Sequence, residues 1–423
     1  MGKSLVKAFL FLLLASNSFA LTDGAKKLIQ YETQSNAVSQ RDSRPIQMPH
    51  FEIPLDMVEL DFADRFPQAL REHFIFQKDG KKYVRWVLNP EDTKWFEEVQ
   101  QHFQNKGLKL EKKYYFTGYQ TASRSYIVED PGKKIQFSIK SSTNKTGGWW
   151  ADKKQPVGEA IDSRLNADFL HDIQARLPFK NIIVMDEPAI FKLPGIDQAV
   201  VLRDLVDLNT KADRIYVPGF SVLHDETGRM IAAKNGSNDP YEFWTEHYIK
   251  ATGRALGELA ARTGMQFDSP HSQNFLVELD ANLKPTGRIV IRDLADLYID
   301  KTIMKELHPQ QEKYFKEFSQ RGNILGSIAA GFGPLHGNEA PSWVRDSGYS
   351  AWKNVFFKEF ESTFEKITSL KPSQFKSSEG HINGKYFGNT YSVAKNEGTE
   401  GFWKNMSIYK NPAGVMLCSQ TFK

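Results

Sequence analysis

Two residues with metal-binding side chains flank a segment that has the pattern of a β-hairpin. Asn274 directly precedes the apolar run 275–279, and Asp293 follows the run 288–291, with the turn-like residues 280–287 between the runs. Antiparallel pairing of the runs would bring Asn274 and Asp293 to the same open end of the hairpin. An amide oxygen beside a carboxylate is a typical Mg²⁺ pair, because magnesium prefers hard oxygen ligands and keeps positions for water and phosphate. The spacing therefore predicts a magnesium site there.

The loop before this hairpin adds further polar side chains. His271 and Gln273 lie beside Asn274 and could donate hydrogen bonds to a ligand. Protein kinases combine an asparagine with a downstream metal-binding aspartate in the same way. A simpler interpretation also fits the spacing, in which Asn274 closes a turn and Arg292 forms a surface ion pair with Asp293.

A long helix must position this loop and hairpin. Asp239 is a natural N-cap, Pro240 suits the first helical position, Glu242 can close a capping box, and Gly264 ends the pattern, so a helix is expected over about residues 240–262. Its apolar residues recur at helical spacing and predict one buried face: Trp244, Tyr248, Ala251, Ala255 and Leu259. Helix, loop and hairpin thus follow one another.

Several shorter segments have strand or helix patterns. The alternating segment 134–140 predicts a half-buried strand, and it leads into the turn-rich residues 141–148. Residues 182–185 and 198–202 also have strand patterns, and charged residues follow each of them. Helices are expected over residues 92–103 and 352–367.

The segment from Gly264 to Asp293 resembles a signature of the siderophore synthetases that work without a peptide-synthetase assembly line, the aerobactin-synthetase-like family. The resemblance rests on the aromatic-rich helix, the His-x-Gln-Asn loop, the two apolar strands and the Arg-Asp end, and it covers about residues 131–300. It implies that His271 and Gln273 belong to an ATP site, with Asn274 and Asp293 holding Mg²⁺.

A second motif of that family, a strand ending in Thr-Ser-x-x-Arg-Thr, is similar to residues 141–146. Ser142 and Thr146 match it, and Lys145 stands in the place of the arginine. Lysine keeps the positive charge and loses the bidentate fork. The resemblance implies that these three side chains bind the phosphates of ATP.

Between the two motifs the resemblance implies further site residues. Lys153 or Lys154 would supply another basic phosphate ligand, and Glu187 and Arg203 correspond to a glutamate and an arginine followed by an acid. The residues expected to act in catalysis are His271, Lys145 and Arg203; those expected to bind the cofactor are Ser142, Lys145, Thr146, Lys154, Arg203, His271 and Gln273.

Composition favours a globular α+β protein of several lobes, for which the resemblance implies the synthetase fold with a kinase-like helix, loop and hairpin. The net charge of +4 over 423 residues, without a run of like charges, argues against a nucleic-acid partner. The single Cys418 excludes an intramolecular disulfide. The expected division is a signal peptide at 1–20, a polar linker at 21–50, an N-terminal α+β lobe at 51–130, the nucleotide-binding core at 131–300 and a mainly helical lobe at 301–423.

The first twenty residues have the pattern of a secretory signal peptide. Lys3 and Lys7 precede the apolar run 8–15, and Ser18-Phe-Ala20 is a small-x-small end. We expect cleavage after Ala20 and a periplasmic or secreted protein. No later run reaches the length that spans a bilayer, so no membrane span is expected after removal of the signal.

The function that follows is activation of a carboxylate by ATP- and Mg²⁺-dependent adenylation, for condensation with an amine or hydroxyl group. The resemblance implies citrate or a similar polycarboxylate as substrate. Two alternatives stay open: an exported protein without catalytic activity on the same scaffold, which binds a small anion or a partner, and a kinase-like phosphotransferase. The adenylation hypothesis also predicts that Lys145 and Arg203 face Asp293 across one cleft.

Overall fold

The structure is a computed structural model, and it describes the following parts of the chain. These are residues 21–35, 43–121, 124–132, 135–145, 152–210, 213–267, 272–299, 341–344 and 348–371, with 307 and 309 singly. The expected signal peptide at 1–20 and the expected site residues Thr146 and His271 lie outside them.

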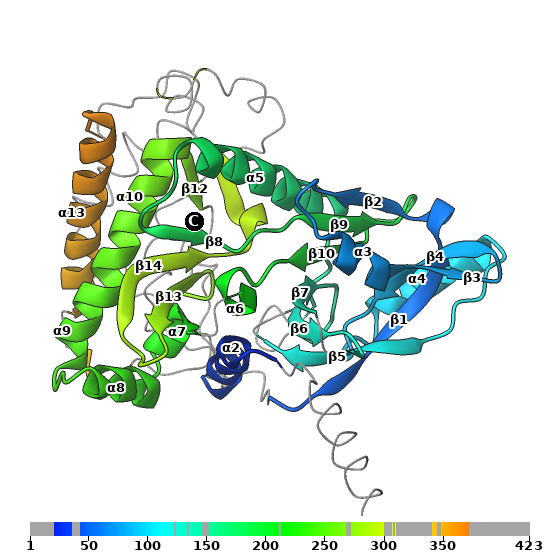
Figure 1. The fold of residues 1–423 in the computed structure, drawn as a ribbon, viewed down its shortest axis with the longest axis horizontal. Helices are drawn as coiled ribbons and strands as arrows, with labels where there is room; N and C mark the ends of the chain where they lie inside the picture. The colour runs from blue at the N-terminus through cyan, green and yellow to red at the C-terminus, as the bar shows by residue number, and fades with distance from the viewer. Residues whose placement is uncertain are drawn as a thin grey trace, which may run out of the picture.

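A nine-stranded antiparallel sheet forms one end of the molecule (Figure 1). Its strands, in spatial order, are β2 (Glu59–Phe62), β9 (Ala189–Lys192), β10 (Ala199–Arg203), β7 (Gln136–Lys140), β6 (Ser125–Glu129), β5 (Lys113–Gln120), β1 (Ile46–Pro54), β4 (Lys81–Val87) and β3 (Ile75–Lys78). The helices α3 (Gln68–Phe74) and α4 (Trp95–Asn105) bury Phe74 and Phe103 in the core of this sheet. The strand expected at 134–140 is β7, and the helix expected at 92–103 is α4.

The expected boundary between residues 130 and 131 is wrong as a structural border. β6 pairs with β7 across it, with Tyr126 opposite Ile139, and β10 then pairs with β7. Sheet pairing of residues that lie on both sides of position 130 therefore joins the expected lobe and the expected core into one unit.

A smaller, four-stranded sheet forms the other end. Its order is β11 (Arg214–Pro218), β13 (Phe275–Asp280), β14 (Pro285–Ile291) and β8 (Ile182–Val184), with β14 and β8 parallel. The expected hairpin is confirmed, with Phe275 opposite Ile291 at its open end. A separate two-stranded sheet joins β12 (Met265–Phe267) to β15 (Leu297–Ile299).

The long helix before the hairpin is also confirmed. It runs as α9 (Pro240–Trp244), the π-turn η2 (Thr245–Lys250) and α10 (Ala251–Thr263). The Asp239 side chain accepts a hydrogen bond from the Glu242 amide at 3.1 Å, and Gly264 ends the helix in the left-handed region at φ 69°. All five residues of the expected apolar face are buried in the core between α10 and the four-stranded sheet.

A second helix, α13 (Gly348–Thr368), packs along α10 on the outer side of the molecule (Figure 1). The two backbones meet at two glycines of α10. A Cβ atom on Gly253 would lie 2.6 Å from the Phe356 carbonyl oxygen, and one on Gly257 would lie 2.6 Å from that of Phe360. Only glycine permits so close an approach.

The polar linker expected at residues 21–50 is wrong for most of its described length. Residues Asp23–Gln34 form α2, which packs on β11, and residue 46 begins β1. The linker prediction weighed the polar composition, whereas α2 buries Leu28 and Ile29 together with the polar Glu32. The buried charge is satisfied by a partner far along the chain, which composition does not reveal.

One long helix, α5 (Val157–Arg176), contacts β9 and β10 of the nine-stranded sheet and also α10, which packs on the smaller sheet (Figure 1). The remaining short elements are η1 (Leu55–Met57), α6 (Asp207–Thr210), α7 (Gly219–Val222), α8 (Asp225–Lys234) and η3 (Leu294–Asp296). The protein thus has the multi-lobed α+β architecture that was expected. None of the described helices combines the length and the apolar character needed to cross a bilayer.

Candidate functional site

A polar cavity of about 210 Å³ lies where the nine-stranded and the four-stranded sheets meet. Lys140 of β7 and Arg203 of β10 reach it from one sheet, and the open end of the β13–β14 hairpin reaches it from the other. Six basic and three acidic side chains line it, together with Ser125, Gln273 and Asn274: Arg124, Lys140, Lys153, Lys154, Arg203 and Arg292, and Glu159, Asp293 and Asp296.

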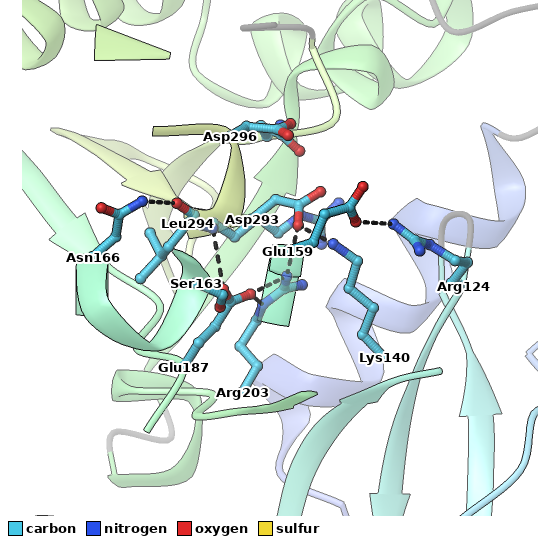
Figure 2. Close-up of polar contacts among 12 residues, drawn as sticks. Arg124, Lys140, Glu159, Ser163, Asn166, Glu187, Arg203, Asp293, Leu294 and Asp296 are labelled. Atoms are coloured by element: carbon cyan, nitrogen blue, oxygen red, sulfur yellow. Dashed lines mark hydrogen bonds and ion pairs between the residues drawn. The ribbon is translucent and has the colours of Figure 1, made fainter. Parts of the chain in front are cut away.

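Asp293 lines this cavity and lies among the polar contacts drawn in Figure 2. The Lys140 ammonium forms an ion pair with Asp293 Oδ1, and Arg203 Nη2 lies 3.7 Å from the same oxygen. Burial alone would raise the pKa of Asp293, but Lys140 and Arg203 hold it well below its ordinary value. Asp293 is therefore a carboxylate throughout the ordinary pH range, already facing two cations.

The turn that carries Asp293 is fixed by buried hydrogen bonds. Asp293 has a left-handed backbone (φ 65°), which turns the chain sharply after β14. Buried Glu187 accepts a hydrogen bond from the Leu294 amide at 3.1 Å, and it also accepts hydrogen bonds from Ser163 and Arg203 (Figure 2). From α5, Asn166 donates to the Leu294 carbonyl oxygen at 2.6 Å.

A second carboxyl group faces the same space. Asn274 Nδ2 donates to Asp296 Oδ2 at 3.1 Å, which leaves the amide oxygen of Asn274 to act as a ligand. Burial and the neighbouring charge of Asp293 raise the pKa of Asp296 to about 7. One amide oxygen and two carboxyl groups of different protonation state thus converge.

Lys153 is the cation of the cavity without a direct carboxylate partner in the described chain. Its ammonium forms neither a hydrogen bond nor an ion pair with a described residue, whereas Lys154 binds Glu98 at 3.0 Å and Arg124 lies 3.5 Å from Glu159. Burial lowers the pKa of Lys153 and the charge of Arg124 lowers it further, while the charges of Asp293 and Asp296 act in the opposite direction. The half-buried Lys153 thus gives the cavity a cation that no direct ion pair occupies.

The helix α2 supports the open end of the β13–β14 hairpin. Arg292 donates to the Gln273 carbonyl oxygen at 2.9 Å and forms a buried ion pair with Glu32 of α2. Arg292 therefore fixes the loop before β13 and the turn after β14 at the same time.

The structure brings five of the expected site residues to the cavity: Lys154, Arg203, Gln273, Asn274 and Asp293. Ser142 is not at the cavity; its hydroxyl donates to Gln198 Oε1 at 2.7 Å and accepts from the Gln155 amide at 2.8 Å. Both bonds tie the end of β7 to its neighbours, so Ser142 has a structural environment.

The expectation that Lys145 faces Asp293 is not met. Lys145 is exposed and is not among the described residues that line the cavity. The chain turns away after β7, because Thr143 pairs with Lys153 in an isolated β-bridge and its hydroxyl accepts from the Lys145 amide at 3.1 Å. Lys140, at the end of β7, is the lysine that reaches Asp293.

Sequence reasoning missed Arg124, Lys140, Glu159 and Asp296 as site residues. One signal could have found Lys140 and Arg124: charged residues at the ends of apolar strands often lie where sites are built. The alternation of β7 hid Lys140, since it assigned polar residues to a solvent face, whereas both faces of this strand are covered. Asp296 follows the hairpin by one short turn and carried no pattern of its own.

Oxygen donors for a divalent cation are present in this site. Asn274, Asp293 and Asp296 supply the amide and carboxylate oxygens that Mg²⁺ prefers, and magnesium commonly needs only one or two protein carboxylates beside substrate phosphates. The residues present therefore fit a phosphate-bound magnesium ion. Within the described chain, no three His, Cys, Asp or Glu side chains form a cluster that could hold a metal by themselves.

No protein-family model and no curated protein sequence matches this chain. Among solved structures, the chain is similar to the petrobactin biosynthesis protein AsbB from Bacillus anthracis, with a TM-score of 0.53 and 12% identity over 81% of this chain and 63% of that chain. It is also similar to aerobactin synthetase IucC of a hypervirulent Klebsiella pneumoniae, with a TM-score of 0.52 and 11% identity over 78% of this chain and 65% of that chain. The chain has the siderophore-synthetase fold.

A third solved structure agrees with this assignment. Aerobactin synthetase IucA of the same pathotype has a TM-score of 0.51 and 13% identity, over 84% of this chain and 68% of that chain. The siderophore-synthetase fold confirms the fold that the resemblance implied. This chain spans somewhat under two thirds of AsbB and of IucC, so their complete activities are not transferred with the fold.

Proposed function

We propose that this protein activates a carboxylate by ATP- and Mg²⁺-dependent adenylation, for condensation with an amine or a hydroxyl group. The observation that carries the proposal is the half-buried Lys153, which has no direct ion pair in the described chain, beside Arg124, Lys140 and the carboxyl groups of Asp293 and Asp296. A nucleotide phosphate brings both an anion and a divalent cation. The anion would bind the basic side chains of this cavity, and the cation would bind its carboxyl groups.

The basic residues would bind and orient the phosphate chain. Lys153 and Arg124 would compensate its negative charge, and Lys140 and Arg203, already fixed by Asp293, would limit its movement. Asn274, Asp293 and Asp296 would hold the Mg²⁺ ion, which supplies charge neutralisation at the phosphate oxygens when bound. Because these groups are positioned by buried hydrogen bonds, they need little rearrangement to accept the ligand.

In the proposed reaction a substrate carboxylate oxygen attacks the α-phosphorus of ATP and pyrophosphate leaves. The acyl-adenylate then reacts with the amine or hydroxyl group, which forms an amide or ester and releases AMP. No protein nucleophile is needed, in agreement with a cavity lined by charged and amide groups. A polycarboxylate such as citrate is the proposed acid, on the basis of the family resemblance.

Hydroxylamine trapping tests this proposal. The purified chain, ATP and Mg²⁺ are incubated with citrate and related acids, and hydroxamate and released pyrophosphate are measured. We expect product with at least one polycarboxylate and a strong reduction in Lys153→Gln. ATP binding without hydroxamate or pyrophosphate from any acid would overturn the adenylation proposal.

The size of the cavity favours one alternative, a protein that binds a small anion without catalysis. About 210 Å³ accommodates a phosphate-sized group but is below the usual range of cavities that enclose a drug-sized ligand. Under adenylation the ribose and base would bind outside it. Tight binding of inorganic phosphate or pyrophosphate together with weaker binding of ATP would support this alternative.

A further inference from the structure

A second, larger cavity lies beside β10. It has a volume of about 680 Å³ and is bounded by α3 and the residues before it, by α5, by the beginning of β7 and by the end of β10. Arg203 contributes to its lining as well as to that of the smaller cavity. Its size lies within the range of cavities that bind small organic molecules.

The walls of this larger cavity are largely apolar. Side chains from several elements contribute to them: Phe66, Leu70, Phe137, Ala167, Val184 and Leu202. Phe66, Phe137 and Leu202 are themselves buried and belong to the packed core, so this wall is rigid. Polar side chains also line the cavity, among them Gln136, His171 and Gln174, but the apolar wall favours a ligand with a hydrocarbon body.

The two guanidinium groups at this cavity already have carboxylate partners. Arg65 binds Asp186 with Nε to Oδ2 at 2.5 Å and Nη2 to Oδ1 at 2.8 Å, and it also contacts Asp168. Arg203 donates to Glu187 with Nη2 to Oε1 at 2.5 Å. Neither arginine is therefore available to a carboxylate ligand without breaking an ion pair.

Asp204 is the charged group of this lining without a charged partner. It accepts hydrogen bonds from the Val206 amide at 3.1 Å and from Asn209 Nδ2 at 3.3 Å, and it forms no ion pair with any described residue. Asp204 is exposed at the mouth of the cavity, and the surrounding protein and the nearby charge of Asp186 raise its pKa. A cation beside Asp204 would offset the repulsion between these two carboxylates.

Asn209 lies next to Asp204. The amide group of Asn209 donates to Asp204 and to the Gln136 carbonyl oxygen at 3.1 Å, and its unpartnered Oδ1 is buried. Asn209 therefore holds Asp204 in place, and the Asp204 carboxylate is the acceptor that a ligand can reach. An ammonium group provides three hydrogen-bond donors and the matching charge.

We propose that this cavity binds an alkylammonium ligand, whose hydrocarbon body lies against the apolar wall and whose ammonium group binds Asp204 at the mouth. The inference does not depend on adenylation, because it uses neither the anion cavity nor a nucleotide. Since Arg203 borders both cavities, the bound amine would lie on the other side of that residue from the anion.

The test measures binding of three probes of equal chain length to the full chain by calorimetry in the absence of nucleotide: hexylamine, hexanol and hexanoate. We expect hexylamine to bind best and hexanoate worst. Asp204→Asn should weaken hexylamine roughly five- to tenfold and leave hexanol unchanged. Asp213→Asn is the matched control, since Asp213 is exposed and pairs with Arg214 outside the cavity.

A second variant tests the location independently of charge. Ala175 lines the cavity from an exposed position on α5, so Ala175→Phe should obstruct the site without disturbing the core and should weaken both hexylamine and hexanol. Equal binding of the three probes, a preference for hexanoate, or unchanged hexylamine binding in Asp204→Asn would overturn the proposal. Because ATP is absent, none of these outcomes bears on adenylation.

Discussion

At the scale of single residues, Lys153 is the side chain on which the proposed anion site depends. The other basic residues of the cavity have carboxylate partners, so their presence alone would be explained by stability. A lysine held in the cavity without one, with a lowered pKa, opposes the folded state until a ligand neutralises it.

Lys153→Gln should therefore weaken binding of pyrophosphate and of ATP with Mg²⁺ by about ten- to a hundredfold, which corresponds to about 1.5–3 kcal/mol. The free energy of unfolding without ligand should stay unchanged or rise, because the lowered pKa of Lys153 shows that its charged form is disfavoured in the folded protein. Calorimetry and urea unfolding measure the two effects. Lys145→Gln is the matched control, and similar losses in both variants would contradict the assignment of the cavity as the anion site.

Asp296 gives a prediction about pH. Its folded pKa of about 7 lies above the unfolded value of about 3.9. The contribution of Asp296 to the free energy of unfolding is thus complete below about pH 4 and is lost as pH rises to about 7. The difference of about 3 between the two pKa values corresponds to about 4 kcal/mol, so Asp296→Asn should gain stability over the wild type by up to this amount across the window, with a constant difference above it. Urea midpoints from pH 4 to 8 measure this, and a difference independent of pH would refute it.

At the scale of elements, α2 shows how a helix outside the β13–β14 hairpin supports the site. Its Glu32 is fully buried and pairs with Arg292, which fixes the backbone on both sides of the hairpin end. Removal of one partner from a buried pair leaves the other charge desolvated, and the cost is large.

We expect Glu32→Gln to lower the free energy of unfolding by about 3–5 kcal/mol. Asp23→Asn, in the first turn of the same helix, is the control, since Asp23 is 84% exposed in its pair with Lys26. That substitution should change stability by less than about 1 kcal/mol. Chemical unfolding of both variants provides the comparison, and losses of equal size would show that α2 matters only as a helix.

The contact between α10 and α13 depends on Gly253 and Gly257. Gly253→Ala should cost on the order of 1–3 kcal/mol, because the new methyl group meets the Phe356 carbonyl oxygen and the helices must separate. Gly158→Ala, near the start of α5, meets no atom within 4 Å and should stabilise by up to about 1 kcal/mol. Thermal unfolding should move in opposite directions for the two variants.

The elements that sequence predicted well carry their signals locally. The capped helix from Pro240 and the hairpin after Asn274 are defined by residues within a few positions of one another, so capping and strand patterns were sufficient. Lys140 and Arg124 reach the site only through pairing in the nine-stranded sheet, and Lys145 was misplaced because the bridge between Thr143 and Lys153 turns the chain. Contacts between residues so far apart along the chain leave no periodic pattern in the sequence.

At the scale of the whole molecule, the sequence predicted the fold class better than it predicted the boundaries between lobes. The nine-stranded sheet takes strands from residues 46–203, and α2 closes the smaller sheet from the start of the chain. Expected borders drawn at changes of composition therefore divided one packed unit. The segment expected as a linker failed for the same reason, because polar residues in it bind buried partners.

Export remains a proposal, and it makes a prediction about the mature chain. Thr22 caps α2 by accepting a hydrogen bond from the Ala25 amide at 3.2 Å, so cleavage after Ala20 would leave this cap intact. We expect intact-mass analysis of the natively produced protein to give a chain that begins at Leu21. A cytosolic protein that still carries residues 1–20 would refute export.

The ion pair of Glu32 and Arg292 also sets an order in time. Its partners are 260 positions apart, so a ribosome makes α2 long before the residue that pairs with its Glu32. Contacts of such separation form late in folding, because the intervening loop must close before they contribute. Until then the hairpin end lacks its support from α2. The proposed anion site is therefore completed late in folding, and a chain kept unfolded for transport would carry no formed site until it is released.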